Sequence, residues 1–241
     1  MRLDLYLVQQ GYFPSRQKAI DAIKNNRVKI NSSVVAKPSY DIDNDKQIEV
    51  MRLEADFVSR AGIKLHYALQ YFHVELKNSV CLDIGSSTGG FTDCCLQHGA
   101  RLVYAIDVGT NQLDTALRCD QRVILRENTN ARMLTTADFE TLPDFICMDV
   151  SFISVKLLIP TVASLLKSGK EAVILIKPQF EVGQRFLTKK GIVKDSRQEK
   201  RVLDEIASLL LENNLIQSNY IKSPIKGREG KIEYLVYLIK K

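Results

Sequence analysis

The most informative stretch of the sequence is Asp83-Ile84-Gly85-Ser86-Ser87-Thr88-Gly89-Gly90-Phe91. It joins an apolar strand expected over residues 80–84 to a helix expected over residues 91–97, because Gly and Ser separate two periodic segments. Glycines at such a turn let the backbone approach a ligand closely at the carboxyl end of a strand. Their spacing differs from G-x-G-x-x-G, which argues against a site for the pyrophosphate of a dinucleotide.

Strands and helices alternate along the chain beyond this stretch. Apolar runs predict strands over residues 80–84, 102–107, 123–125, 145–149 and 172–177. Helical spacing predicts helices over residues 91–97, 112–118, 155–166 and 196–212. The last two expected strands, residues 215–221 and 232–239, have no helix between them, which indicates an antiparallel end. The pattern predicts an α/β fold with a mostly parallel sheet covered on both faces.

The first fifty-odd residues indicate a smaller α+β unit. A short helix is expected before Gly11, and Ser15 can cap a second helix. Residues 27–30 and 47–50 alternate apolar and polar side chains as strands do. The expected organisation is a small domain over residues 1–55, a linker over 56–60 and the α/β domain over 61–241.

Composition and charge limit the class of protein. The chain has 241 residues, of which 45% are hydrophobic, yet it lacks the run of about 20 apolar residues that a membrane span needs. Five cysteines without a C-x-x-C and three histidines predict neither a disulfide framework nor a zinc site. We therefore expect a cytoplasmic protein without a metal. The net charge of +6 favours a polyanionic partner, although a basic solvated surface explains it equally well.

Two acids at strand ends indicate the ligand of the glycine turn. Asp83 suits a cationic group, and Asp107, at the end of the next strand, is placed to accept hydrogen bonds from ribose hydroxyls. S-adenosylmethionine has an ammonium, a sulfonium and a ribose but no phosphate, so it fits these features. The expected cofactor-binding residues are Asp83, Gly85, Ser87, Thr88, Gly89, Gly90, Phe91 and Asp107.

The N-terminal unit resembles the ribosomal S-four-type RNA-binding domain. The matching residues are Arg2-Leu3-Asp4, Ser15-Arg16, Lys18-Ala19, Val28-Lys29-Ile30-Asn31 and Lys37-Pro38. Asn26 and Ser32 stand where that family usually has glycine in its turns; Asn tolerates the left-handed conformation, so Asn26 is expected to keep its turn. The resemblance implies binding of structured RNA, and the expected RNA-binding residues are Arg2, Ser15, Arg16, Lys18 and Lys37. Without it, a small scaffolding domain would be the simpler interpretation.

The rest of the chain resembles the FtsJ-like ribose methyltransferases, and within them the TlyA (hemolysin A) family. The cofactor turn matches D-x-G-x-S-x-G-G-F, with Ser86 where that family often has alanine. The most specific signatures are Asp149-Val150-Ser151-Phe152-Ile153-Ser154 and Lys177-Pro178-Gln179-Phe180-Glu181. Ala61 replaces the second small residue of a motif usually written S-R-G-G. The resemblance spans essentially the whole chain and implies a Rossmann-like methyltransferase fold.

The resemblance also implies a catalytic tetrad of Lys64, Asp149, Lys177 and Glu233. The residues support two members independently, because Asp149 and Lys177 each end an apolar strand, where a charge is costly unless it is paired or functional. In this mechanism neutral Lys177 accepts the hydroxyl proton, Asp149 orients the amine, and the other two position the ribose. The alternatives are a structural Asp149–Lys177 ion pair, a solvated Lys64 and a surface Glu233.

Together with these features, the resemblance implies an rRNA 2′-O-methyltransferase that uses S-adenosylmethionine and acts on a cytidine. Its expected partners are rRNA or ribosomal subunits rather than a membrane. Two other functions stay open from the sequence. One is a haemolysin or pore former, although the chain shows no spanning segment. The other is an RNA-binding protein whose methyltransferase fold is inactive, although all four tetrad positions are filled. The nucleotide, the ribosomal subunit and the oligomeric state are not determined by the sequence.

Overall fold

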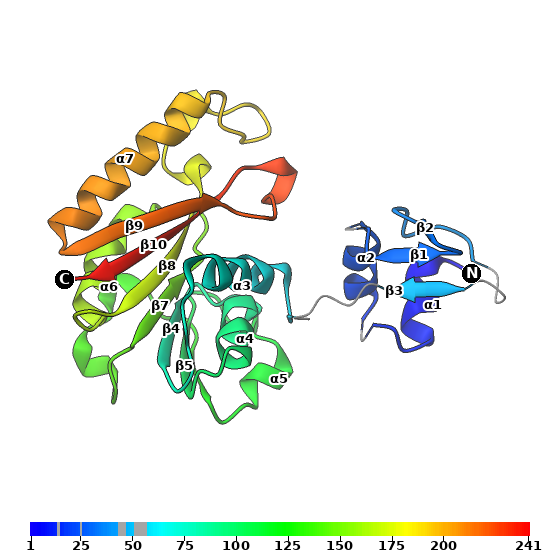
Figure 1. Ribbon diagram of the computed structural model, residues 1–241, viewed down its shortest axis with the longest axis horizontal. Helices are drawn as coiled ribbons and strands as arrows, with labels where there is room; N and C mark the ends of the chain where they lie inside the picture. The colour runs from blue at the N-terminus through cyan, green and yellow to red at the C-terminus, as the bar shows by residue number, and fades with distance from the viewer. Residues whose placement is uncertain (14, 25, 43–46, 51–56) are drawn as a thin grey trace. The chain divides into compact units, whose positions relative to one another are not determined.

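The computed structural model describes residues 1–241 except 14, 25, 43–46 and 51–56. The chain divides into two compact units, Met1–Asp56 and Phe57–Lys241 (Figure 1). Of the expected linker over residues 56–60, Asp56 lies outside the described residues. Phe57 is buried, and the amide of Val58 donates a hydrogen bond of 2.7 Å to Asp93 Oδ2. The described part of that stretch, residues 57–60, therefore belongs to the second unit.

The first unit packs two helices on a small antiparallel sheet. Its described elements are α1 (Leu3–Gln9), α2 (Arg16–Lys24), β1 (Val28–Ile30), β2 (Ser33–Val34) and β3 (Ile48–Val50), with strand order β2-β1-β3. The core forms where the inward side chains of both helices meet those of β1, among them Leu3, Ile23 and Val28. Asn26 has φ +58°, which confirms its predicted turn, and Ser32 has φ +64°. The short strand β2 was not predicted from the sequence.

The second unit contains a mostly parallel sheet, as predicted. Over residues 57–241, all of them described, the strands are β4 (Val80–Ile84), β5 (Leu102–Ile106), β6 (Val123–Arg126), β7 (Phe145–Met148), β8 (Glu171–Ile176), β9 (Leu215–Lys222) and β10 (Tyr234–Lys240). Their order is β6-β5-β4-β7-β8-β10-β9. β10 runs antiparallel to both β8 and β9, which confirms the predicted antiparallel end.

Helices cover the two faces of this sheet (Figure 1). They are α3 (Arg60–Phe72), α4 (Gly90–Gln97), α5 (Thr115–Arg118), α6 (Ile159–Leu165) and α7 (Ser196–Glu212). The largest core forms where α6 and α7 pack on the sheet, and its strand side chains are continuous apolar rows, as a sheet buried on both faces requires. The carboxyl ends of β4, β7 and β8 thus meet at one edge.

Two helices differ from their predicted ranges. The predicted helix over 155–166 is divided into a short 3₁₀ segment, Val155–Leu157, and α6, because Pro160 lies in the first turn of α6, where its missing N–H is tolerated. The predicted helix over 112–118 begins only at Thr115, because the Asp114 carboxylate accepts a hydrogen bond from the amide of Ala116 and caps the helix there.

Candidate active site

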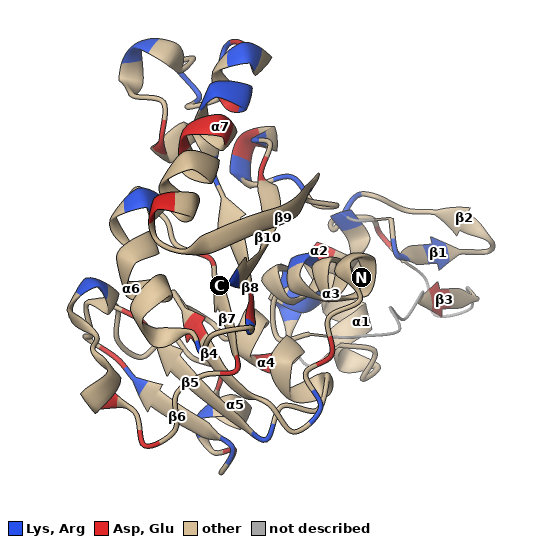
Figure 2. Ribbon diagram, turned by 60° about the vertical axis from the view of Figure 1, so that its left-hand side comes forward, with Lys and Arg blue, Asp and Glu red and all other residues tan. Residues whose placement is uncertain are grey.

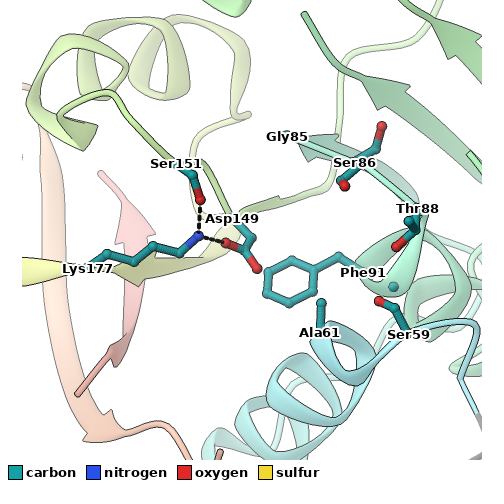
Figure 3. Close-up of a pocket in the computed structure, with 11 residues that line it drawn as sticks. Ser59, Ala61, Gly85, Ser86, Thr88, Phe91, Asp149, Ser151 and Lys177 are labelled. Carbon is teal, nitrogen blue, oxygen red and sulfur yellow. Dashed lines mark hydrogen bonds and ion pairs between the residues drawn. The ribbon is translucent and has the colours of Figure 1, made fainter. Parts of the chain in front are cut away.

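A pocket lies at the carboxyl edge of the sheet, where ligands bind in open α/β folds. It holds about 450 Å³ of space, part of it open to solvent. Residues from α3's start, from the β4–α4 turn and from the ends of β7 and β8 line it (Figure 3): Ser59, Ala61, Gly85, Ser86, Ser87, Thr88, Gly90, Phe91, Asp149, Ser151 and Lys177. Of the predicted cofactor-binding residues, Asp83, Gly89 and Asp107 are not among them.

The β4–α4 turn brings backbone close to backbone. Gly85 has φ +84°, and a Cβ at this position would lie 2.6 Å from the carbonyl oxygen of Asp149. Gly89 has φ +94° and faces Leu113 and Leu117 rather than the pocket. The turn therefore requires glycine at both positions, once for close approach to the Asp149 loop and once for packing on α5.

Asp83 is fully buried behind this turn. Its Oδ2 accepts a hydrogen bond of 2.7 Å from Thr92 Oγ1, while its Oδ1 has no hydrogen-bond partner among the described residues. Burial raises the pKa of this carboxyl to about 7, and the nearby Asp149 and Asp107 charges act in the same direction. The Ser86 hydroxyl, which lines the pocket, is also buried without a partner. This polar and acidic surrounding fits a ligand that carries positive charge and hydrogen-bonding groups.

Asp107 organises the turn from the next strand. Its carboxylate accepts hydrogen bonds of 2.7 Å from the amides of Ser87 and Gly109. Ser87 has φ +47°, so the first of these bonds holds a residue in a conformation that non-glycine residues rarely adopt. Each carboxylate oxygen keeps acceptor capacity for the ribose contact that the sequence predicted.

Asp149 and Lys177 form an ion pair at the pocket (Figure 3). They directly follow β7 and β8, two neighbouring parallel strands, so both side chains reach the same edge. Lys177 Nζ lies 2.5 Å from Asp149 Oδ1 and donates a hydrogen bond of 2.7 Å to Ser151 Oγ. The contact between Lys177 Nζ and Asp149 Oδ1 is therefore a close charge–charge contact.

Lys64 and Glu233 form a second buried ion pair. Lys64 Nζ on α3 donates a hydrogen bond of 2.6 Å to Glu233 Oε2, directly before β10. The interpretations of a solvated Lys64 and a surface Glu233 are wrong, because both residues are buried. Tyr234 pairs with Ile176 in the antiparallel register, so Glu233 lies beside Lys177, one residue beyond that ladder. The structure thus brings all four predicted tetrad residues to one region.

Several residues of this region were not predicted from the sequence as members of the site. Thr92 holds Asp83, and Ser151 holds Lys177. Ser86, Ser59 and Ala61 line the pocket but were noted only as parts of motifs or as departures from them. Short polar side chains inside a family motif were the available signal, but their spacing alone does not reveal which charged group they contact.

The predicted RNA-binding residues lie on the first unit, where Lys and Arg are found on α2 and β1 (Figure 2). Arg2 and Arg16 donate hydrogen bonds of 2.9 to 3.0 Å to the buried carboxylate of Asp4. The guanidiniums themselves reach solvent. Ser15 is exposed and its Oγ accepts a hydrogen bond of 3.3 Å from the amide of Lys18, and Lys37 is exposed on a separate loop.

Comparison with known proteins assigns both units. Residues 57–240 match the family model of the FtsJ-like methyltransferases, and residues 1–48 match the S4 domain. Hemolysin A of Brachyspira hyodysenteriae is 42% identical over 99% of this chain and 100% of its own. The 23S rRNA (cytidine-2′-O)-methyltransferase TlyA of Campylobacter jejuni is 36% identical over 100% of both chains.

Solved structures agree with this assignment. One from Streptococcus thermophilus is 39% identical and has a TM-score of 0.78, covering 100% of this chain and 88% of that chain. An S-adenosylmethionine-dependent methyltransferase from Mesorhizobium loti is only 14% identical, yet shares the fold with a TM-score of 0.54 over 72% of this chain and 96% of that one. Among the described residues, none of the helices is both long and apolar enough to span a bilayer. The chain belongs to the FtsJ-like methyltransferase family, in the group that contains TlyA and hemolysin A, and is an S-adenosylmethionine-dependent enzyme with an S4 domain in its first unit.

Proposed function

We propose that this enzyme methylates the 2′-hydroxyl of a cytidine in rRNA. The observation that carries the proposal is the Asp149–Lys177 pair beside the glycine turn, where an amine and a cofactor can both meet a ribose hydroxyl. The name of the Campylobacter jejuni relative, which covers the whole chain, supports cytidine 2′-O-methylation. The S4 domain match supports RNA as the substrate.

The cofactor supplies an electrophilic methyl group when it is bound. We assign its binding to the turn residues that line the pocket, which are Gly85, Ser86, Ser87, Thr88, Gly90 and Phe91. Gly89 shapes this turn, Asp107 holds it, and Asp83 supplies a buried acid behind it. The protein's task is then to hold the hydroxyl in line and to remove its poorly acidic proton.

Lys177 is the proposed proton acceptor. Its neutral amine takes the proton that the ribose hydroxyl loses, and Asp149 and Ser151 hold the resulting ammonium. The contacts of both residues with Lys177 Nζ support this role. Lys64 and Glu233 hold each other beside this pair and position the ribose. Enclosure strengthens these charge interactions, because the local dielectric constant is lower than that of water.

The small domain over residues 1–55 is proposed to contact the RNA. The proposed contact residues are Arg2, Ser15, Arg16, Lys18 and Lys37. The Arg2 and Arg16 guanidiniums stay partly in solvent while Asp4 fixes their orientation. Arginines presented in this way suit phosphate oxygens, which accept their N–H groups in a bidentate geometry.

The test is methyl transfer from labelled S-adenosylmethionine to purified ribosomal subunits and to free rRNA, followed by mapping of the methyl group. We expect a 2′-O-methylated cytidine and its loss in Lys177→Met. The matched control is Lys77→Met, because Lys77 is exposed before β4, at the opposite edge of the sheet. A methyl group on a base, or full activity of Lys177→Met, would contradict the proposal. Cofactor binding without transfer to any rRNA would favour the inactive RNA-binding protein.

A further inference from the structure

Two loops at the pocket leave neighbouring strands and carry the Lys177 pair. Residues 149–155 follow β7 and contain Asp149 and Ser151, while residues 177–182 follow β8 and begin with Lys177. The contacts of Lys177 therefore depend on how these two loops are fixed relative to each other. The amide of Asp149 still donates a hydrogen bond of 3.0 Å to the carbonyl oxygen of Ile84, and the loop after β8 contains a 3₁₀ turn, Pro178–Phe180. Ser151 lies beyond the Asp149 bond, in neither a helix nor a strand.

Glu181 joins the two loops. Its Oε2 accepts a hydrogen bond of 2.5 Å from Ser154 Oγ, and its Oε1 accepts one of 2.9 Å from the amide of Val155. Both carboxylate oxygens of Glu181, in the loop after β8, thus accept hydrogen bonds from the end of the 149–155 loop. The rings of Phe152 and Phe180 add a second contact, with centroids 5.2 Å apart.

The loop after β7 needs such support from outside. Phe152 has φ +64°, a left-handed conformation that is unfavourable for a bulky residue, and its side chain is 91% exposed. A residue in this conformation persists only where the surrounding structure fixes it. The bonds from Glu181 lie two and three residues beyond Phe152, whereas Ser151 lies directly before it.

We propose that Glu181 is a positioning residue for the reaction: it clamps the 149–155 loop so that Asp149 and Ser151 converge on Lys177 Nζ. This inference rests on the proposed function of Lys177. Glu181 makes its contacts with Ser154 and Val155 and acts through the loop rather than on the substrate. A displacement of about 1 Å at a reacting group can reduce a rate about 100-fold, so a loosened loop has a measurable effect.

The first test compares Glu181→Ala with Glu181→Gln in single-turnover methyl transfer at saturating cofactor and RNA. We expect Glu181→Ala to lose about 10- to 100-fold in rate with unchanged affinities for both, because only the geometry at Lys177 changes. Glu181→Gln should stay within about threefold, since its amide oxygen accepts from Val155 and its NH₂ donates to Ser154 Oγ. Glu140→Ala, at an exposed acid of the same unit, is the control.

A second measurement does not depend on methyl transfer. Hydrogen exchange of peptides that cover residues 149–158 should be faster in Glu181→Ala than in the wild type and in Glu181→Gln. If exchange is faster in Glu181→Ala than in the wild type but the wild type methylates no rRNA, the positioning role of Glu181 in the loop is supported and the proposed function is wrong. Unchanged exchange in Glu181→Ala, equal rate losses in both variants, or a loss confined to RNA affinity would overturn the clamp.

Discussion

Each unit contains a buried aspartate, and the pKa values of the two are shifted in opposite directions. Asp4 in the first unit accepts hydrogen bonds from Arg2 and Arg16, and the Arg2 contact leads in lowering its pKa to about 2. Asp83 in the second unit has a hydroxyl partner on one oxygen, whereas its other oxygen has no partner in the part of the chain that the structure describes, and burial raises its pKa to about 7. Both side chains are 0% exposed, so the cations around a carboxylate, rather than its burial alone, decide its charge.

The two units also differ in how far their acid–cation pairs are exposed to solvent. In the first unit the acid is hidden while the Arg2 and Arg16 side chains are 46% and 52% exposed. In the second unit the Lys177–Asp149 side chains are 10% and 15% exposed and both partners are enclosed. Cations that face solvent suit phosphates and respond to salt. Enclosed pairs suit a reacting hydroxyl, because preorganised charges act strongly where water is excluded.

The largest effect is expected when the enclosed pair is broken. Asp149→Asn keeps the shape of the side chain but removes the charge that holds the Lys177 ammonium, and we expect kcat to fall about 1000-fold. Asp144→Asn is the matched control, because Asp144 precedes β7 as Asp149 follows it and pairs with Lys167 at 3.0 Å. A similar loss in both variants would show a general effect on β7 instead of one on the chemistry.

The next effect concerns Asp83. Because folding raises the pKa of Asp83 from 3.8 to about 7, the folded state binds a proton more tightly than the unfolded state. Its contribution to stability is full below pH 4 and is lost as the pH rises through 7. Between pH 5 and pH 7 this linkage lowers the folding equilibrium constant about 50-fold. Denaturant unfolding should show this fall in the wild type and a flatter profile in Asp83→Asn; parallel profiles would refute the assignment.

A smaller effect on kcat is expected at Gly227, which lies next to the Lys64–Glu233 pair. Gly227 has φ −65°, so alanine fits its backbone, but the added Cβ would clash with the Glu233 carboxylate. We expect Gly227→Ala to displace that carboxylate from Lys64 and to lower kcat about tenfold while the melting temperature stays nearly constant. Wild-type kcat in Gly227→Ala would mean that the Lys64–Glu233 contact does not limit the reaction.

The smallest effect is expected on RNA affinity when Asp4 is changed. Its direction is opposite to the one that net charge alone predicts. Asp4→Asn removes a negative charge from a unit proposed to bind RNA, so simple electrostatics predicts tighter binding. We expect about threefold weaker binding, because Arg2 and Arg16 lose the carboxylate that orients them. Filter binding at fixed salt measures it, with Asp21→Asn as a control for charge in the same unit. Equal gains in affinity for both variants would show that orientation is unimportant.

Much of the fold could be predicted, because apolar runs and helical periods are local signals. The ranges predicted for β4 and α7, residues 80–84 and 196–212, agree with the structure. The two-residue strand β2 could not be predicted, since it is shorter than any pattern. Pro160 and the Asp114 cap shifted helix boundaries through single contacts that periodicity does not contain.

The two ion pairs of the candidate site, Asp149–Lys177 and Lys64–Glu233, differ in how far the sequence predicts them. Asp149 and Lys177 end apolar strands, and neighbouring parallel strands deliver such residues to one edge. Lys64 and Glu233 are 169 residues apart in sequence, and only the family resemblance related them. The contacts of Asp4 and Glu181 were missed, because side-chain hydrogen bonds between loops or helices leave no periodic trace.

We propose that the enclosed Asp149–Lys177 pair carries the chemistry while the exposed arginines of the first unit hold the RNA. Single-turnover methyl transfer with Lys177→Met and Arg16→Ala, over a range of ribosomal subunit concentrations, tests it directly. We expect Lys177→Met to lose about 1000-fold in rate at unchanged RNA affinity, and Arg16→Ala to lose affinity at an unchanged rate. A Lys177→Met enzyme that transfers methyl groups at the wild-type rate would contradict it.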